Sequence, residues 1–459
     1  MTENIKFCVF FVASACAGFF CFQSFAFASD YSTPLAGIKI EDKLDFYIGE
    51  GVFQKFWVPA PSSTTASDGL GPLFNTRSCN NCHVNNGRGH APDEKQSGAS
   101  VPSFLVRLGK SYPALSDKKD RIYPHIGDKR YGHQFQGQSS PGILPEGDYY
   151  LTYSTRIETL SDGSQVQLRK PNLHWSSLNY GEFEASTGFT MLVSPGLVGM
   201  GLLDNIPDEM IMAGADPDDK NNDGISGRVS WIVSDKKKLI GRFGYKASVA
   251  TLSAQNQSAF NTDLGLSTPL HPSPWGDCTE LQTDCLASPN GNSAHLGNLE
   301  VDKQQARLVD LFVSLSSPPT MRNLTNDTFL QGKHIFDESG CASCHTPKMK
   351  TGDHSPFAVL NHRTFYPFTD MLLHDMGEEL ASGFPSFSAR PNEWRTAPLW
   401  GIGVSEKISG RMGFLHDGRA RSIEEAILWH GGEAKQSQEH YKSLSKAQRN
   451  TLIYFLESL

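Results

Sequence analysis

The sequence has no tract of clustered basic residues, and its formal net charge is −8. We therefore predict no nucleic-acid partner, because binding to phosphates needs clustered Lys and Arg. After residue 28 it also lacks any apolar stretch of the roughly 18 residues that a membrane span needs. The remaining composition, 38% hydrophobic and 20% charged over 459 residues, is typical of a globular chain of two or three domains.

The first 28 residues differ from the rest. Lys6 precedes an apolar run at 7–20, and Ala26-Phe27-Ala28 has the small-x-small pattern of a cleavage site before Ser29. This pattern predicts a signal peptide at 1–28, removed on export, and a periplasmic protein without an integral membrane span. A retained anchor is the alternative, although the run is short for a bilayer span.

Cysteine is scarce outside the leader and two short motifs. Three of the nine cysteines lie in the first 28 residues, and four lie in the motifs described next. The remaining two, Cys278 and Cys285, are close together in a loop rich in Pro and Gly. In an oxidising compartment they are expected to form a disulfide, with two free thiols as the alternative. No cysteine then remains for thiol chemistry.

Two C-x-x-C-H motifs carry the chemistry of the chain. Two thiols on one turn can add to the vinyl groups of one haem, and the following His then supplies an axial nitrogen to iron. A C-x-x-C pair can also bind zinc, but a zinc site needs four N or S ligands in one cluster. We therefore predict two c-type haems, attached covalently through Cys79, Cys82, Cys341 and Cys344, with His83 and His345 as axial ligands.

The chain reads as a duplication, because each motif is followed by a closing amphipathic helix. These helices are expected at 302–316 and 445–459, each with capping-box spacing at its start. Pro318-Pro319 follows the first and predicts a break. The predicted domains are therefore an N-terminal haem domain at 29–319 and a C-terminal cytochrome c domain at 320–459. A short helix at 329–336 is expected to lead into the second motif.

The N-terminal unit carries a long insertion rich in Gly, Pro, Tyr and Asp. Within it, strands are expected at 148–159 and 165–170, joined by a hairpin turn at Asp162-Gly163. Insertions of this length usually cover one face of a domain or form a channel to its site.

The sequence resembles the bacterial dihaem cytochrome c peroxidase superfamily, and within it the family of dihaem oxidoreductases sometimes labelled thiol oxidoreductases. The resemblance spans nearly the whole chain after the leader. It lies in segments 71–75, 83–89, 131–136, 168–171, 199–207, 223–228, 241–247, 395–403 and 414–421. It implies a mainly α fold of two cytochrome c-like domains, the N-terminal one enlarged by a loop-rich insertion with some β-hairpin.

The resemblance also implies ligands. In the peroxidases a His-x-Gly segment leads to a helix whose end presents the far-side ligand of the C-terminal haem. Here His416-Asp417-Gly418 leads to His430, which implies a bis-histidine haem with His345. Met376 is the competing ligand, and a helix-end His that interacts with the helix dipole is the alternative reading.

Two catalytic positions follow from the same alignment. Asp263 takes the place of an acid at the open face of the N-terminal haem, and Gln257 approximately takes that of a neighbouring Gln. A carboxylate there can move a proton between the two peroxide oxygens. Phe243 stands where the family has a bridging Trp, so Tyr245 is the candidate electron bridge. A surface Asp and a packing aromatic are the respective alternatives.

Asp219-x-Asn221-x-Asp223-Gly224 has the alternating oxygen ligands of a calcium loop. The Glu expected at position 12 is replaced by Ser230. One calcium ion is therefore a candidate cofactor, and a polar turn is the alternative.

Three functions remain open. The first is a dihaem oxidoreductase, peroxidase-like, which takes electrons from a small redox protein and reduces hydrogen peroxide or another small oxidant. The second is a non-catalytic electron-transfer cytochrome whose first haem is sealed by His90, His125 or His133. The third is an oxygenase or protein-modifying oxidase, as in relatives on this scaffold.

Overall fold

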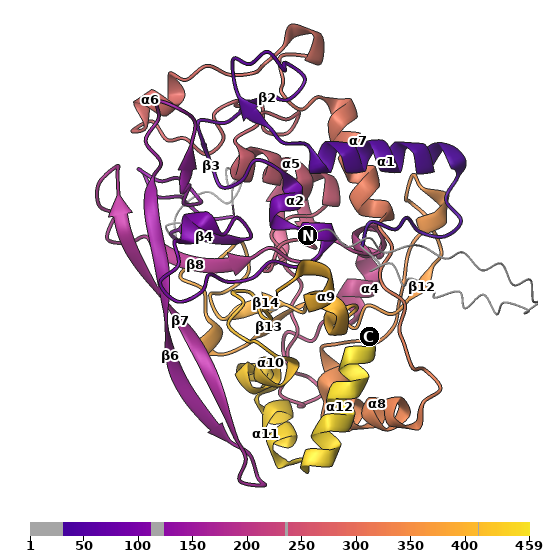
Figure 1. The fold of residues 1–459 in the computed structure, drawn as a ribbon. Helices are drawn as coiled ribbons and strands as arrows, with labels where there is room; N and C mark the ends of the chain where they lie inside the picture. Colours follow the sequence, from indigo (N-terminus) through magenta and orange to yellow (C-terminus); the bar gives the residue numbers. More distant parts are fainter. Residues whose placement is uncertain (1–30, 112–123, 235–236, 412) are drawn as a thin grey trace, which may run out of the picture.

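The computed structural model describes residues 31–111, 124–234, 237–411 and 413–459 (Figure 1). The predicted signal peptide at 1–28 lies outside this range. None of the helices in the described ranges is both long and apolar enough to cross a bilayer.

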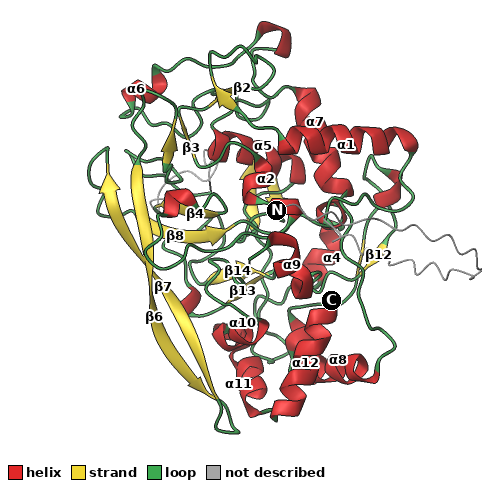
Figure 2. Cartoon of the chain, viewed as in Figure 1, coloured by secondary structure: helices red, strands yellow, loops and turns green. Residues whose placement is uncertain are grey.

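Helices make up 31% of the structure and strands 20%, so the expectation of a mainly α chain is wrong (Figure 2). The helices are α1 (Ile40–Gln54), α2 (Cys79–Cys82), α3 (Met200–Asp204), α4 (Asp208–Ala213), α5 (Leu252–Leu264), α6 (Thr283–Leu286), α7 (Lys303–Leu315), α8 (Asp327–Glu338), α9 (Ser405–Ser409), α10 (Ile423–Trp429), α11 (Lys435–Ser443) and α12 (Lys446–Ser458). The strands are β1 (Val58–Pro59), β2 (Asp68–Leu70), β3 (Leu73–Phe74), β4 (Phe104–Gly109), β5 (Gln138–Ser139), β6 (Gly147–Thr159), β7 (Gln165–Leu178), β8 (Gly188–Val193), β9 (Trp231–Ser234), β10 (Lys237–Ile240), β11 (Met349–Lys350), β12 (Thr364–Phe365), β13 (Leu373–Asp375) and β14 (Glu393–Arg395).

The insertion explains the extra strand content. Its predicted hairpin is confirmed as β6 and β7, but β7 runs eight residues beyond the expected end at Lys170. A second antiparallel pair, β4 with β8, was not expected. It buries Phe104, Val106 and Leu108 against the aromatic residues of the hairpin. Alternate residues of β4 are buried, which is the pattern of a strand with one face in a core.

The two predicted closing helices are confirmed as α7 and α12, and both begin with a capping box, at Asp302 with Gln305 and at Ser445 with Gln448. Each packs against a helix that precedes a C-x-x-C-H motif, α7 on α1 and α12 on α8. A Gly lies at each crossing. A Cβ on Gly49 would lie 2.1 Å from the Leu308 carbonyl, and one on Gly332 would lie 2.4 Å from that of Thr451. The motifs therefore sit in two similar helical frames.

The hydrophobic clusters combine residues from both sides of Pro318-Pro319. The largest cluster joins α1 and α7 with Met349, Leu360 and Trp400. The second joins α8 and α12 with Leu160 and Leu168 from the insertion. The boundary at 320 stays a prediction, and the two halves share their cores.

Candidate haem sites

The first C-x-x-C-H motif forms one helical turn. Cys79 and Cys82 begin and end α2, and neither forms a disulfide with another described cysteine. Burial raises the pKa of Cys79 to about 12 and also raises that of Cys82. Nδ1 of His83 lies 2.8 Å from the Pro195 carbonyl oxygen. Because a carbonyl can only accept, Nδ1 carries the proton and Nε2 remains available to iron.

The second motif repeats this arrangement. Cys341 and Cys344 lie on a single turn, and Nδ1 of His345 lies 2.9 Å from the Phe368 carbonyl oxygen. Burial lowers the pKa of both motif histidines to about 4, which keeps each imidazole neutral as iron requires. The residues of both motifs thus fit a covalently held haem.

His430 lies close to His345. It follows the last residue of α10, and its Nδ1 lies 2.7 Å from the Ala426 carbonyl oxygen, which again directs Nε2 outward. The two imidazoles interact electrostatically, since a charge on His430 helps to lower the pKa of His345. Met376, the competing ligand, is partly buried beside the cluster that holds α10. The bis-histidine assignment therefore stays a prediction with a consistent geometry.

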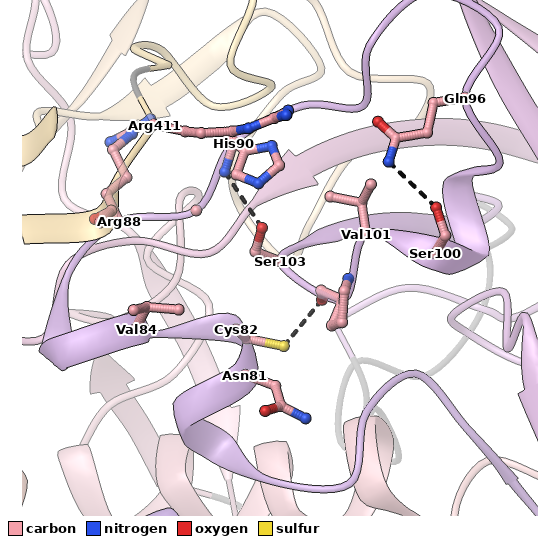
Figure 3. A pocket seen from close by; sticks show the side chains of 13 residues that line it. Asn81, Cys82, Val84, Arg88, His90, Gln96, Ser100, Val101, Ser103 and Arg411 are labelled. Carbon is pink, nitrogen blue, oxygen red and sulfur yellow. Dashed lines mark hydrogen bonds between the residues drawn. The ribbon is translucent and has the colours of Figure 1, made fainter. Parts of the chain in front are cut away.

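A cleft of about 290 Å³ opens beside Cys82 (Figure 3). Figure 3 shows Cys82 on one side and Arg88, His90 and Arg411 on the other. The Cys82 thiol donates to the Pro102 carbonyl at 2.9 Å. Arg88 donates to the carbonyls of Gly413 and Leu415, so the wall of the cleft joins the N-terminal motif to the C-terminal half. Arg88 is held by these carbonyls, and Arg411 pairs with Asp93 at 3.1 Å.

The structure places Asp263 beside the first motif. It lies near the end of α5, and its backbone carbonyl accepts from the N–H groups of Asn75 and Thr76, just before Cys79. Gln134 donates to its carboxylate at 2.8 Å. Burial raises the pKa of Asp263, while the Arg107 charge partly opposes that rise. Its charge in turn raises the pKa of Cys79, so the two groups are close.

Gln257 does not join Asp263. It lies six positions earlier on α5, on another face, where it donates to the Ser253 hydroxyl at 3.1 Å and accepts from the Leu270 N–H at 3.1 Å. Gln134 contacts Asp263 instead, and it also donates to the Asn75 side chain. The sequence contained a signal for Gln134, because it lies within the family-like segment 131–136.

The three histidines proposed to seal the first haem differ in their partners. Nδ1 of His90 lies 3.0 Å from the Ala91 carbonyl oxygen, and Nδ1 of His133 lies 2.9 Å from Asp277. His125 is only 6% exposed, and among the described residues neither of its ring nitrogens has a hydrogen-bond partner of standard geometry. Burial lowers its pKa well below the usual value, and a contact with the Leu108 backbone opposes that shift. Its ring centroid lies 4.5 Å from that of Phe384. His125 is the one of the three whose ring nitrogens are both uncommitted.

Tyr245 is partly buried, and its backbone carbonyl accepts from the Arg395 N–H of the C-terminal half. Its ring contacts Trp394 edge-on, with centroids 6.4 Å apart, and Trp394 stacks on His416 at 3.8 Å. Burial raises the pKa of Tyr245, and the Arg88 charge opposes that rise. Arg88, which lines the cleft beside Cys82, therefore lies close to Tyr245. This position is compatible with both proposed roles of Tyr245, an electron bridge and a packing aromatic.

Sequence reasoning missed a charged histidine beside the second motif. His374 lies between Asp370 and Glu433, at 2.8 and 2.7 Å, and 3.5 Å from the Cys344 sulfur. Burial opposes its charge, but hydrogen bonds with Asp370, Cys344 and Glu433 raise the pKa of His374 to about 12. The carboxylates that hold it are remote in sequence, so no local pattern pointed to it.

The remaining predicted sites lie away from both motifs. In the calcium-like loop, Asp219 and Asp223 accept hydrogen bonds from backbone N–H groups of the loop itself, and Asn221 donates to Asp223 at 2.9 Å. Within the described residues, no group of three or more His, Cys, Asp or Glu is placed to hold a metal ion. Cys278 and Cys285 are joined as a disulfide, with Cα atoms 6.2 Å apart.

Two turns with paired thiols, each followed by an oriented neutral imidazole, define the site of a haem protein. The chain belongs to the family described as "Di-haem oxidoreductase, putative peroxidase", whose model matches residues 12–103 and 117–459. No curated protein matches it. Among solved structures it is similar to a chain of hydrazine synthase from Kuenenia stuttgartiensis, pressurised with xenon, at 14% identity. That likeness covers 55% of this chain and 88% of the other, with a TM-score of 0.25.

Proposed function

We propose that this chain is an exported, periplasmic c-type dihaem oxidoreductase that reduces hydrogen peroxide or a related small oxidant at its N-terminal haem. The family supports an oxidoreductase with two haems. The observation that carries the peroxidase reading is Asp263, a partly buried carboxyl group beside the first motif that accepts a hydrogen bond from Gln134. Electrons enter from a small redox protein at the C-terminal haem.

The chain's own residues divide the work. Cys79, Cys82, Cys341 and Cys344 would hold the haems. His83, His345 and His430 would supply Nε2 to iron, because the Nδ1 of each already faces a backbone carbonyl. A bound haem would supply an iron that exchanges electrons with the oxidant.

Asp263 takes the proton from the peroxide oxygen nearest the haem and returns it to the outer oxygen, which then leaves as water. The overall change consumes two electrons and two protons for each peroxide and yields two waters. Gln134 would hold the Asp263 carboxylate toward the peroxide. Tyr245 is our candidate for passing electrons from the C-terminal haem to the N-terminal haem.

The visible spectrum of the pure protein tests this proposal. One equivalent of hydrogen peroxide is added to the diferric and to the half-reduced protein. A rapid change in the Soret band in either state supports an open, reactive haem. Unchanged spectra in both states, with two low-spin haems, would overturn the peroxidase assignment.

His125 supports a second candidate, the electron-transfer cytochrome. A buried imidazole with two unpartnered nitrogens costs about 1–3 kcal/mol per group unless another partner satisfies it. A bond to the iron of the first haem would satisfy one of the two nitrogens. In that case His125→Ala converts one haem from low to high spin, whereas His90→Ala leaves the spin state unchanged. No spin change in these two variants or in His133→Ala would remove this candidate.

A further inference from the structure

The hairpin of the N-terminal half extends to the C-terminal haem site. β6 and β7 pair from Gly147 with Leu178 to Thr159 with Gln165, and Figure 1 shows the tip beside α10 and α11. The side chains of Leu160 and Leu168 are buried in the same cluster as Leu428 and Trp429. The hairpin is therefore packed against the C-terminal helices along its outer half.

Polar contacts fasten the tip to the last two helices. Asp162 accepts from Arg449 at 3.0 Å, and Glu158 accepts from Lys442 at 3.1 Å. The N–H of Ser161 donates to the Lys442 carbonyl at 3.0 Å. These contacts fix where the hairpin lies relative to α11 and α12.

The hairpin also binds the segment that leads into α10. Arg169 donates to the carbonyls of Gly418 and Arg419 at 3.1 and 3.0 Å. Arg421 donates to the Gln167 carbonyl at 2.7 Å. The turn from His416 to α10 is thus tied to β7 at several points.

One hairpin contact reaches the residue beside the predicted ligand. Trp429 ends α10 and directly precedes His430. The guanidinium of Arg156, from β6, lies 4.6 Å from the Trp429 ring centroid, and that of Arg419 lies 4.7 Å from it. The Trp429 indole nitrogen is buried and has no hydrogen-bond partner among the residues that the structure describes. Packing and these two cations therefore hold the ring in place.

The orientation of His430 depends on this ring. α10 has only seven residues, Ile423–Trp429, and a helix this short relies on tertiary packing for its stability. The Nδ1 contact of His430 is to the Ala426 carbonyl within the same helix. A tilt of the last turn therefore moves Trp429 and the imidazole together.

We propose that the β6–β7 hairpin is a positioning device for the C-terminal haem: through Arg156 on Trp429 it holds His430 at the axial position. This inference rests on the proposed function, which makes His430 an iron ligand. It means that a segment of the N-terminal half determines how firmly His430 stays bound to the iron of the C-terminal haem.

The test uses carbon monoxide, which binds ferrous haem only where an axial position is free. Arg156→Gln in the two-haem protein should gain bound carbon monoxide over the wild type, by a fraction of one molecule per chain. His430→Ala defines the full gain of one. Lys170→Gln is the matched control, because Lys170 lies on β7 and pairs with Glu379 at the surface at 2.9 Å. It should bind no more than the wild type.

A substitution that keeps the charge separates positioning from general damage. Arg156→Lys should return carbon monoxide binding toward the wild-type level, because an ammonium retains the interaction with the ring. The haem count and circular dichroism establish that each variant is folded. If His430→Ala gains one molecule but Arg156→Gln gains none, the positioning role is refuted while the ligand stands. If His430→Ala itself gains none, the ligand assignment fails, and this inference fails with it.

Discussion

At the scale of single residues, the decisive feature is Asp263, a partly buried carboxyl group beside the first motif. Asp263 is surrounded by Gln134, the Asn75 segment and the first motif, and burial raises its pKa. Desolvation disfavours the charged form, while the Arg107 charge favours it. The group is thereby suited to exchange a proton in the reaction that we propose.

The first prediction concerns the rate of reaction with peroxide. The carboxylate must accept a proton, so the rate should rise as the pH increases through the raised pKa of Asp263 and then level off. Asp263→Asn should slow the reaction about 10²–10⁴-fold and abolish this pH dependence. Stopped-flow mixing with hydrogen peroxide over a range of pH measures both effects.

Asp310→Asn is the matched control for that experiment. Asp310 is a second acid whose pKa is raised by burial, and it accepts from Asn256 at 2.8 Å, but it contacts neither motif. Its variant should keep the wild-type rate and profile. An equal loss in both variants would show that the effect is structural.

At the scale of elements, the chain uses one helical arrangement twice. A helix before the motif crosses a capped closing helix at a Gly, as α1 with α7 and α8 with α12. Each crossing brings two backbones close together, and each closing helix relies on its cap to satisfy its first N–H groups. Removing the cap of either closing helix should therefore lower the free energy of unfolding.

The second prediction follows for α12. Ser445→Ala removes the oxygen that accepts from the Gln448 N–H, and it should lower the free energy of unfolding by about 1 kcal/mol. Denaturant titration of the two-haem protein, followed by circular dichroism, measures the change. Ser443→Ala, two residues earlier at an exposed position outside the cap, should be close to neutral. Equal effects in the two variants would contradict the role of the cap.

At the scale of the whole molecule, the insertion ties distant segments together. Glu300 is buried and accepts from the Ser267 N–H at 2.7 Å, the Ser267 hydroxyl at 2.9 Å and the Gly291 N–H at 2.8 Å. Burial nevertheless raises its pKa from 4.5 to about 7, because desolvation outweighs these donors. The protonation of Glu300 should therefore make its own contribution to the pH dependence of the global stability.

The third prediction is a pH dependence of unfolding. The folded state binds the Glu300 proton more tightly than the unfolded state does. Stability should therefore be highest below pH 4.5 as far as this group is concerned, and it should fall as the pH rises to about 7. The fall is on the order of 3 kcal/mol. Denaturation midpoints between pH 4 and 8 measure it.

Glu300→Gln should flatten that dependence, since the amide does not titrate. Glu280→Gln, at an exposed site, should keep the wild-type slope. A wild-type slope in Glu300→Gln would mean that another group titrates in this range.

The fourth prediction concerns the covalent frame. Non-reducing digestion and mass spectrometry should yield one peptide pair that links Cys278 and Cys285, as the structure places them. Free thiols at both positions would contradict the disulfide.

Local patterns in the sequence were sufficient for several features. The C-x-x-C-H turns, the capping boxes of α7 and α12 and the Asp162-Gly163 hairpin were all predictable, because each depends on residues a few positions apart. The position of Asp263 beside the first motif agrees with the expectation from the family resemblance, although its role is untested. The mainly α fold class was wrong because the strands of the insertion depend on pairing between distant segments.

Only the tertiary structure decided which distant residues meet. Gln134 rather than Gln257 contacts Asp263, because six positions on a helix do not share a face, whereas the chain before β5 returns to α5. His374 becomes a charged group only because Asp370 and Glu433 converge on it. The reach of β6–β7 to Trp429 likewise depends on packing across the chain. The spacing of neighbouring residues determined the C-x-x-C-H motifs and the helix caps. Burial and strand pairing between distant segments decided which residues surround those motifs.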